Sequence, residues 1–216
     1  MTSNKYLFLV DFDNTLINND ELKEKLFDSI KTVLGEEEAL KFWNHHSGFE
    51  NHQMYVDYPI IVREYCSVEY PDSYNLKVTS IFDNMDISAC VNRNAKETLK
   101  YLSSLGVVLI FTGGDVEFQK KKVEKSSLDK FVDGVRVFPF KMEHFVNTIN
   151  EYPNKQVIYI DDNPYNLDMA KKTITGITTI WVMQGHYCRE NPNYANSDLC
   201  IPNIGKLLEI KSFEIR

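Results

Sequence analysis

The chain has 216 residues, of which 24 are Lys or Arg and 31 are Asp or Glu, so its formal net charge is −7 at pH 7. This length is sufficient for one substantial core, and a hydrophobic content of 43% is ordinary for a globular protein. The basic residues form no long run, which argues against a nucleic-acid backbone as the main partner but leaves room for a small phosphorylated ligand.

The sequence carries no recognisable signal for secretion or membrane insertion. The first apolar run ends after five residues at Asp11, and no other segment could span a bilayer. We therefore expect a cytoplasmic protein without a membrane partner. The four cysteines are scattered without a CxxC pair, which predicts reduced thiols and not a zinc site. These features favour neither a monomer nor a homodimer.

The first predicted element is a buried strand at 6–10, YLFLV, which is too short for a helix core. It leads directly into Asp11 and Asp13. Ligands of open α/β sheets bind outside the carboxyl ends of the strands, so this pair indicates a site. The alternative interpretation is that Asp13-Asn14 forms only a turn after the strand.

The next seventy residues read as helical. A helix is predicted over 18–35, with Asp20 as its cap, apolar residues at spacings of 4, 4 and 3, and Gly35 at its exit. Further helices are predicted over 36–45, 54–66 and 73–84. Because no convincing buried strand occurs in this region, residues 17–88 are predicted to be a mostly helical insertion.

Strands and helices alternate after the insertion. A helix capped by Asn92 or Asn94 and ended by Gly106 precedes a strand at 107–111. Further strands are predicted at 135–138, 157–160 and 178–183, with helices at 116–125, 142–150 and 167–172. This pattern predicts an α/β fold with a Rossmann-like parallel sheet and right-handed crossovers.

Polar residues follow three of these strands at the point where each one ends. They are Asp11 and Asp13 after the first strand, Thr112 after the second, and the pair Asp161 and Asp162 after a third. The carboxyl ends of parallel strands lie on one edge, so these side chains should converge. Carboxylates this close repel one another unless a cation lies among them, and their oxygens suit Mg²⁺. A second positive charge is available from Lys141.

Taken together, these residues resemble the motifs of the haloacid dehalogenase superfamily. The first motif, DxDxT, stands here as Asp11-Phe12-Asp13-Asn14-Thr15, and the second, a Thr after an apolar strand, as Thr112 in LIFTGG. The third, a Lys about twenty residues before the last motif, is best matched by Lys141. The fourth, an acidic pair, stands as Asp161-Asp162 in IYIDDNPYN. The resemblance covers 5–16 and about 92–205.

The resemblance implies a phosphoryl transfer in two steps. Asp11 would attack phosphorus to form an aspartyl-phosphate, and Asp13 would serve as the general acid and then the general base. Thr112, Gly113 and Lys141 would bind the phosphoryl oxygens. Superfamily members that cleave carbon–halogen bonds lack an acid at the position of Asp13, so its presence favours phosphate esters.

The same resemblance implies that Mg²⁺ is held by Asp11, the main-chain carbonyl of Asp13, and an acid of the fourth motif. Alignment to the GD pattern makes Asp162 the direct ligand, whereas alignment to acidic pairs also engages Asp161. Lys122 competes with Lys141 for the role of phosphate lysine, although a solvent-exposed position on a helix is the simpler interpretation of Lys122.

The position of the insertion implies a helical cap that selects the substrate. On this interpretation, residues 1–16 and 89–216 form the catalytic core and 17–88 the cap, with His45, His46 and Arg63 as candidate specificity residues. The histidines here fit no standard zinc spacing.

The sequence therefore predicts a Mg²⁺-dependent phosphomonoester hydrolase acting on a small phosphorylated metabolite. Two alternatives remain, a phosphotransferase or phosphomutase of the same superfamily, and a binding protein that keeps the fold without turnover. The binding protein is disfavoured because all the charged catalytic positions are occupied.

Overall fold

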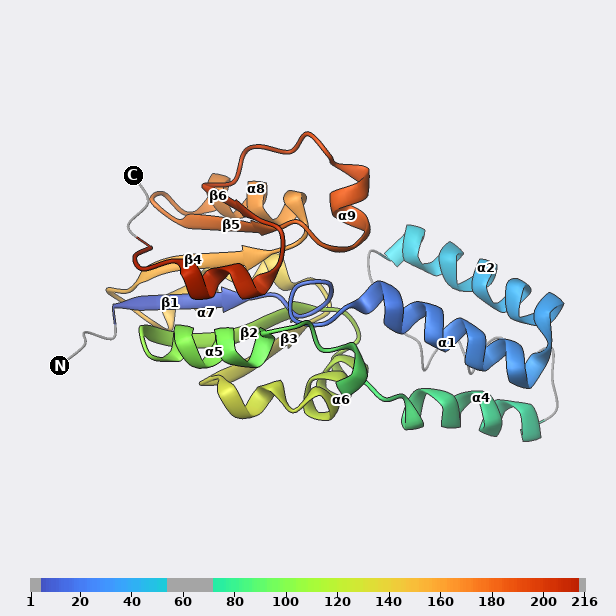
Figure 1. Cartoon of the computed structure of the whole chain (residues 1–216). Coiled ribbons are helices and arrows are strands. Elements are labelled where there is room, and N and C mark those ends of the chain that lie inside the picture. Colours follow the sequence, from blue (N-terminus) through green and yellow to red (C-terminus); the bar gives the residue numbers. More distant parts are fainter. Residues whose placement is uncertain (1–4, 54–71, 214–216) are drawn as a thin grey trace.

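The structure is a computed structural model that describes residues 5–53 and 72–213, with the side chains of 45–53 and 72–75 outside the description. It contains a six-stranded sheet in the order β3-β2-β1-β4-β5-β6, and all neighbouring strands pair in parallel (Figure 1). The strands are β1 (Tyr6–Val10), β2 (Gly106–Gly113), β3 (Gly134–Phe138), β4 (Gln156–Asp161), β5 (Thr178–Val182) and β6 (Leu199–Ile201). The predicted α/β fold with a parallel sheet is confirmed.

Strand β1 lies in the middle of the sheet and is buried on both faces. Alternate side chains of a strand point to opposite sides, so Leu7 and Leu9 face one layer of helices while Phe8 and Val10 face the other. All four are fully buried. This double burial is the reason that β1 reads as a continuous apolar run.

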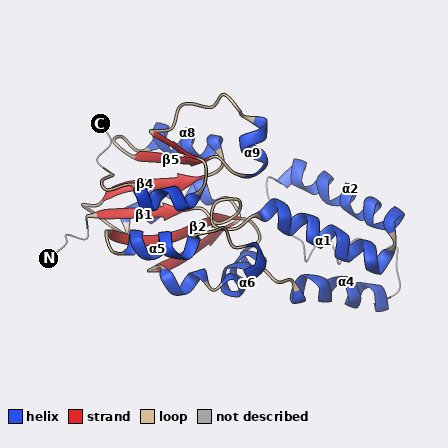
Figure 2. Cartoon of the chain, in the orientation of Figure 1, coloured by secondary structure: helices blue, strands red, loops and turns tan. Residues whose placement is uncertain are grey.

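Helices cover both faces of the sheet (Figure 2). One face packs against α5 (Ala95–Ser103), α6 (Val116–Ser126) and the 3₁₀ turn η4 (Ile204–Glu209). The other face packs against α7 (Phe145–Asn150) and α8 (Pro164–Thr173). Shorter elements complete this part of the chain: η1 (Ser88–Cys90), η2 (Leu128–Phe131), η3 (Lys141–His144) and α9 (Gly185–Glu190).

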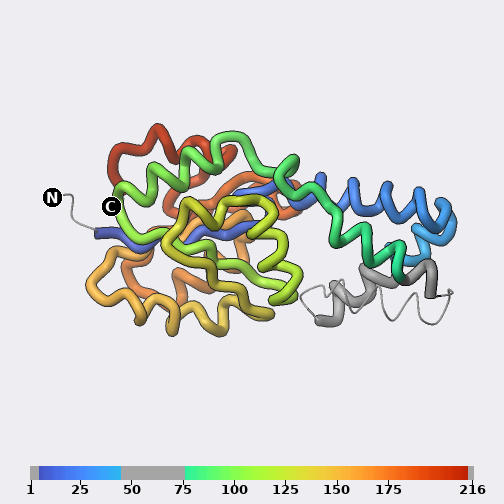
Figure 3. Tube along the Cα trace, turned by 90° about the horizontal axis from the view of Figure 1, so that it is seen from below, coloured from blue at the N-terminus to red at the C-terminus, as the bar shows by residue number. Residues whose placement is uncertain are grey.

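Three described helices form the insertion that follows β1: α1 (Asn19–Leu34), α2 (Glu36–Gln53) and α4 (Asp72–Asn84). Figures 1 and 3 place them beyond the carboxyl ends of the strands. They share a small core of their own that includes Leu26, Ile30, Phe42 and Val78, and Phe118 of α6 joins it. The predicted helical character of the insertion is confirmed for the residues that the structure describes.

Several boundaries differ from the prediction. Asn18, and not Asp20, caps α1, because its side chain accepts a hydrogen bond from the Glu21 amide. Helix α2 continues to Gln53 although 46–53 offers no apolar stripe, and Gly106 begins β2 instead of ending a helix. Strand β6 and helix α9 are not predicted, and the helix predicted over 142–150 begins as the 3₁₀ turn η3. The helix predicted over 54–66 lies outside the described residues.

Among the described residues, no helix combines the length and the apolar character that a membrane-spanning segment requires.

Candidate active site

Three adjacent strands present the predicted site residues at one edge of the sheet. Strand β1 lies between β2 and β4, with Val10 paired to Ile110 on one side and to Ile160 on the other. The Asp11 amide extends this pairing by donating to the Ile160 carbonyl over 2.8 Å. Asp11 and Asp161, which follow Val10 and Ile160, therefore emerge at the same level, and Thr112 lies one residue further along β2.

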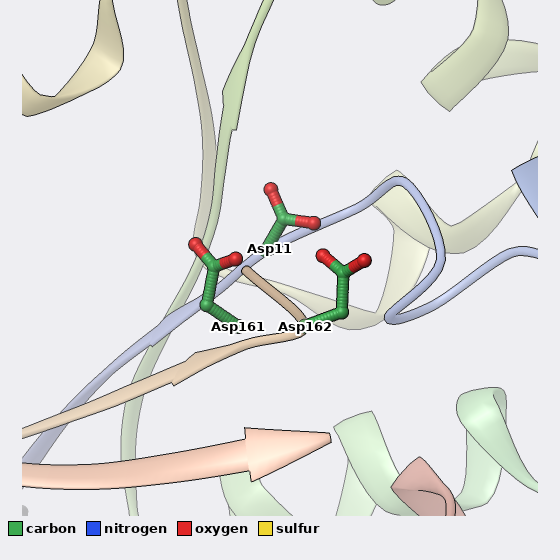
Figure 4. Close-up of side chains that lie close together, drawn as sticks. All are labelled: Asp11, Asp161 and Asp162. Atoms are coloured by element: carbon green, nitrogen blue, oxygen red, sulfur yellow. The ribbon is translucent and has the colours of Figure 1, made fainter. Parts of the chain in front are cut away.

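Asp11, Asp161 and Asp162 form a buried cluster at this edge (Figure 4). Each contributes a carboxylate oxygen, and these three oxygens lie within 4.8 Å of one another. Their exposed fractions are 5%, 0% and 4%. The convergence that the sequence predicted for these three carboxylates is confirmed, whereas Asp13 is not part of the cluster and its side chain is 29% exposed.

Lys141 reaches the cluster from η3, which follows β3. Its Nζ lies 2.5 Å from Asp11 Oδ1 and 2.7 Å from Asp161 Oδ2, and its side chain is 8% exposed. An ammonium in this position neutralises part of the charge of two carboxylates that face each other. Of the two lysines considered from the sequence, Lys141 is the one that contacts Asp11.

Further donors fix the Asp161 side chain. The Tyr159 hydroxyl donates to Asp161 Oδ2, and Asn166 Nδ2 donates to the same oxygen over 3.2 Å. The main-chain amide of Asn163 donates to Oδ1 over 2.8 Å. Together with Lys141, these contacts satisfy both oxygens of a fully buried carboxylate.

The raised pKa values of Asp11 and Asp162 show that Lys141 does not compensate all the negative charge of the cluster. Burial raises the pKa of Asp11 to about 7, with Asp161 adding to the rise and Lys141 opposing it. Burial also raises the pKa of Asp162 well above its usual range, and the neighbouring carboxylates raise it further. Burial alone would lower the pKa of Lys141, but Asp11 and Asp161 hold it well above its ordinary value.

Asp162 supplies the observation that tests whether the cluster fits a metal ion. Its Oδ2 is buried, and no described residue donates a hydrogen bond to it. A buried carboxylate oxygen without a partner is costly, and a hard divalent cation is the ligand that a set of three carboxylates accommodates. Asp11, Asp161 and Asp162 therefore fit a divalent metal site, and such a cation would stabilise their charged forms.

Asp13 meets two side chains of α6. Lys122 Nζ lies 2.5 Å from Asp13 Oδ1, and Gln119 Nε2 lies 2.9 Å from Oδ2. The predicted solvent-exposed position of Lys122 is wrong, because its side chain is only 4% exposed. The usable signal was spacing: Lys122 follows Phe118 by four residues and precedes Val123, so it lies on the buried face of α6.

Gln119 also links Asp13 to the end of β2. Its Nε2 lies 3.1 Å from Thr112 Oγ1 and 2.9 Å from the Gly113 carbonyl oxygen. Thr112 is 1% exposed, at the carboxyl end of the strand where the sequence placed it. Gln119 was not predicted, because a glutamine in the first turns of a charged helix carries no motif of its own.

The predicted specificity residues lie outside the description. The backbone of His45 and His46 belongs to α2, but their side chains are not among those described, and Arg63 falls in the undescribed stretch 54–71. Their role stays a prediction.

The comparisons with known proteins agree with this geometry. The sequence model of the haloacid dehalogenase-like hydrolase family matches residues 7–172. A protein of Burkholderia xenovorans, described as a haloacid dehalogenase-like hydrolase, shares 26% identity and superposes with a TM-score of 0.88, with 96% of each chain covered. Among curated proteins, none matches the chain.

Two structures of lower identity share the fold. A hydrolase of this family from Bacillus subtilis, bound to magnesium, has 14% identity and a TM-score of 0.64, covering 95% of this chain and 97% of its own. A protein from Clostridium difficile described as a phosphatase has 19% identity and a TM-score of 0.64, covering 95% and 98%. The family model spans most of the sequence and ends beyond the Asp161-Asp162 pair, so the chain belongs to the haloacid dehalogenase-like hydrolases.

Proposed function

We propose that this hydrolase is a Mg²⁺-dependent phosphatase that acts on a small phosphorylated metabolite. The observation that carries the proposal is Asp13, a second carboxylate two residues after Asp11 whose side chain is 29% exposed. A leaving alkoxide needs a proton and the attacking water must lose one, and a partly exposed acid beside the nucleophile can serve both needs.

The mechanism begins with Asp11 as the nucleophile. One carboxylate oxygen of Asp11 attacks phosphorus, the bond from phosphorus to the ester oxygen breaks, and that oxygen leaves as an alcohol with the proton of Asp13. A water molecule then attacks the aspartyl-phosphate while Asp13 takes its proton. The phosphorus–oxygen bond to Asp11 breaks, which releases inorganic phosphate and restores both carboxyl groups to their initial states.

Beside Asp11, positive charge comes from Lys141 and, in this proposal, from the metal. Lys141 Nζ, 2.5 Å from Asp11 Oδ1, is placed to neutralise the phosphoryl oxygens as they approach Asp11. Asp11, the Asp13 carbonyl, Asp162 and Asp161 would hold Mg²⁺, which supplies positive charge between the nucleophile and the phosphate when bound. Thr112 and Gly113, at the end of β2, are proposed to contact the phosphoryl group.

The inserted helices are proposed to act as a helical cap of the type inserted after the first strand. In this division, residues 1–16 and 89–216 form the core and 17–88 form the cap. Support comes from the position of α1, α2 and α4 beyond the carboxyl ends of the strands and from the core that they share. His45, His46 and Arg63 remain proposed contacts to the non-reacting part of the substrate.

Carbon–halogen cleavage is the competing activity within the family. It uses an aspartate nucleophile but needs no acid for a halide leaving group, so it would use Asp13 only as the base of the second step. Phosphoryl transfer to a second substrate would require water to be excluded from the aspartyl-phosphate. Hydrolysis is preferred because it uses Asp13 in both steps without that requirement.

The test is hydrolysis of p-nitrophenyl phosphate by the full chain, with Mg²⁺ or with a chelator. We expect turnover that requires Mg²⁺ and that falls by at least about a thousandfold in Asp11→Asn, because the nucleophile is lost. Glu117→Gln, which changes a surface carboxylate that is 79% exposed, is the matched control and should retain full activity.

A parallel reaction with 2-chloropropionate, followed by chloride release, separates the two activities. Chloride release without phosphate ester hydrolysis would replace the phosphatase proposal with a dehalogenase. Phosphate ester hydrolysis that persists in Asp11→Asn would show that Asp11 is not the nucleophile.

A further inference from the structure

We propose that Lys122, together with Gln119, positions the carboxylate of Asp13 for proton transfer from the attacking water. This inference rests on the proposed phosphatase function, in which Asp13 is the base of the second step. It assigns the second buried lysine of the site a task that differs from that of Lys141.

The two oxygens of Asp13 are held separately by one helix. Lys122 Nζ contacts Oδ1 at 2.5 Å, and Gln119 Nε2 donates to Oδ2 over 2.9 Å. Residues three apart lie on the same face of a helix, so α6 presents both donors together. A carboxylate that is hydrogen-bonded at both oxygens cannot rotate freely about its Cβ–Cγ bond. The direction of its lone pairs is therefore fixed.

The ammonium of Lys122 is itself fixed by contacts from several elements. Asn19 Oδ1, on the first residue of α1, accepts a hydrogen bond from Nζ over 3.0 Å. The rings of Phe12 and Phe118 lie with their centroids 5.8 and 5.7 Å from Nζ, within the range of cation–π attraction. Lysine buried to this degree is rare and costly unless paired, so its position depends on the Asp13 charge.

The division between the two buried lysines supports distinct tasks. Lys141 contacts Asp11 and Asp161, whereas Lys122 contacts Asp13. Thus one lysine serves the carboxylate that attacks phosphorus, and the other serves the carboxylate that exchanges protons.

The second half of the reaction is the step that this arrangement affects. The water oxygen forms its bond to phosphorus, the bond from phosphorus to Asp11 breaks, and the water proton moves to an Asp13 oxygen. A general base contributes only when its lone pair points at that proton, because proton transfer depends on hydrogen-bond geometry.

The substrate p-nitrophenyl phosphate isolates this half of the reaction. Its leaving group departs as a stable anion, so the first half needs no proton from Asp13, whereas the second half still needs the base. For Lys122→Met we expect the rate constant of the first p-nitrophenolate release to stay unchanged. Steady-state turnover should fall by at least about tenfold, a part of what a general base contributes.

The steady-state constants give the matching signature. Both kcat and KM should fall by the same factor in Lys122→Met, leaving kcat/KM unchanged, because slower loss of the aspartyl-phosphate lets that intermediate accumulate. Lys122→Arg keeps a cation at the site and should recover most of the turnover. Lys121→Met removes the neighbouring lysine of α6, which is 60% exposed, and should behave as wild type.

Three results would overturn the inference. They are wild-type turnover in Lys122→Met, a fall in kcat/KM with no slow second phase, and no recovery in Lys122→Arg. If Lys122→Met does not fold by circular dichroism, Gln119→Met carries the test, because it releases the other Asp13 oxygen and should slow the same phase. A wild-type protein without any phosphate ester hydrolysis would instead overturn the proposed function itself.

Discussion

The three clustered carboxylates differ in how well their charges are compensated. Asp161 receives hydrogen bonds from Tyr159, Asn166 and Lys141, whereas Asp162 Oδ2 has no donor among the described residues. The most buried acid is therefore fixed by the protein, and Asp162 keeps an oxygen available. This difference supports Asp162, and not Asp161, as the principal ligand of the proposed metal. Asp161 instead links β4 to Lys141 and Asn166.

Replacing Tyr159 with Phe should destabilise the fold through Asp161. The hydroxyl of Tyr159 is fully buried, and its loss removes one donor from a buried carboxylate while leaving the ring in place. A hydrogen bond to a charged group is worth about 1.5–3 kcal/mol, so the unfolding free energy should fall by about that amount. Urea denaturation measures the change. Tyr165→Phe, at an exposed tyrosine of α8, is the control, and an equal loss in both variants would contradict the prediction.

Gly185 is a single residue on which the loop after Asp13 depends. Its φ is +70°, and a Cβ there would lie 2.5 Å from Asn14 Cγ. Gly176 has a similar φ of +78° but no atom within 4 Å of such a Cβ, so it isolates the backbone term. We expect Gly176→Ala to cost about 1 kcal/mol and Gly185→Ala clearly more. Equal thermal unfolding midpoints for the two variants would show that the Asn14 contact has no effect.

At the scale of elements, the sequence was sufficient to predict the central strands of the sheet but not the elements at its edge. Strands β1 and β4 are apolar runs that end in acids, because both faces are buried and the site follows directly. Strand β6 has three residues, and α9 has six with none buried, so neither leaves a periodic pattern. Strand β6 forms by pairing with β5, and α9 packs against α1, so both depend on tertiary contacts.

Helix α6 shows the same limit for the site. The acids and Thr112 could be predicted because each follows a strand, and strand ends share an edge. The burial of Lys122 was not predicted, because a lysine within the run 120–122 is usually solvent-exposed. Its position on the helix mattered more, and its partner Asp13 lies 109 positions away in the sequence.

The contact between α1 and α9 gives a prediction that depends on pH. Asp20 accepts hydrogen bonds from His186 Nδ1 at 3.2 Å and Arg189 Nη2 at 2.6 Å, and these contacts hold its pKa well below the usual range. Asp20 and Arg189 also line a polar pocket of about 500 Å³. A carboxyl whose pKa is lower in the folded state stabilises the fold above its unfolded pKa and loses that effect as pH falls.

Asp20→Asn should therefore lower the unfolding free energy by about 1 kcal/mol at neutral pH. The difference from wild type should shrink below about pH 4, where the carboxyl of the unfolded chain becomes protonated. Denaturant titrations at several pH values measure it. A difference between Asp20→Asn and wild type that stays constant across these pH values would exclude the ionic contribution.

At the scale of the whole molecule, the buried carboxylates couple metal binding to stability. The parallel strands bring Asp11, Asp161 and Asp162 together, so the fold bears the repulsion between their charges, and the proposed Mg²⁺ would relieve that repulsion. A ligand that binds only the folded state stabilises it by about 2.7 kcal/mol at one hundred times its Kd. The thermal unfolding midpoint of the wild type should therefore rise with Mg²⁺ concentration.

Asp162→Asn separates the cost of carboxylate repulsion from the stabilisation by Mg²⁺. Without Mg²⁺, this variant should be at least as stable as wild type, because it removes a buried charge whose Oδ2 has no donor among the described residues. With Mg²⁺, it should gain little, because the proposed principal ligand is lost, so the order of stability reverses between the two conditions. Glu117→Gln should follow the wild type in both. If Asp162→Asn gained as much from Mg²⁺ as the wild type does, the cation would have to bind away from this cluster, and the assignment of Asp162 would be wrong.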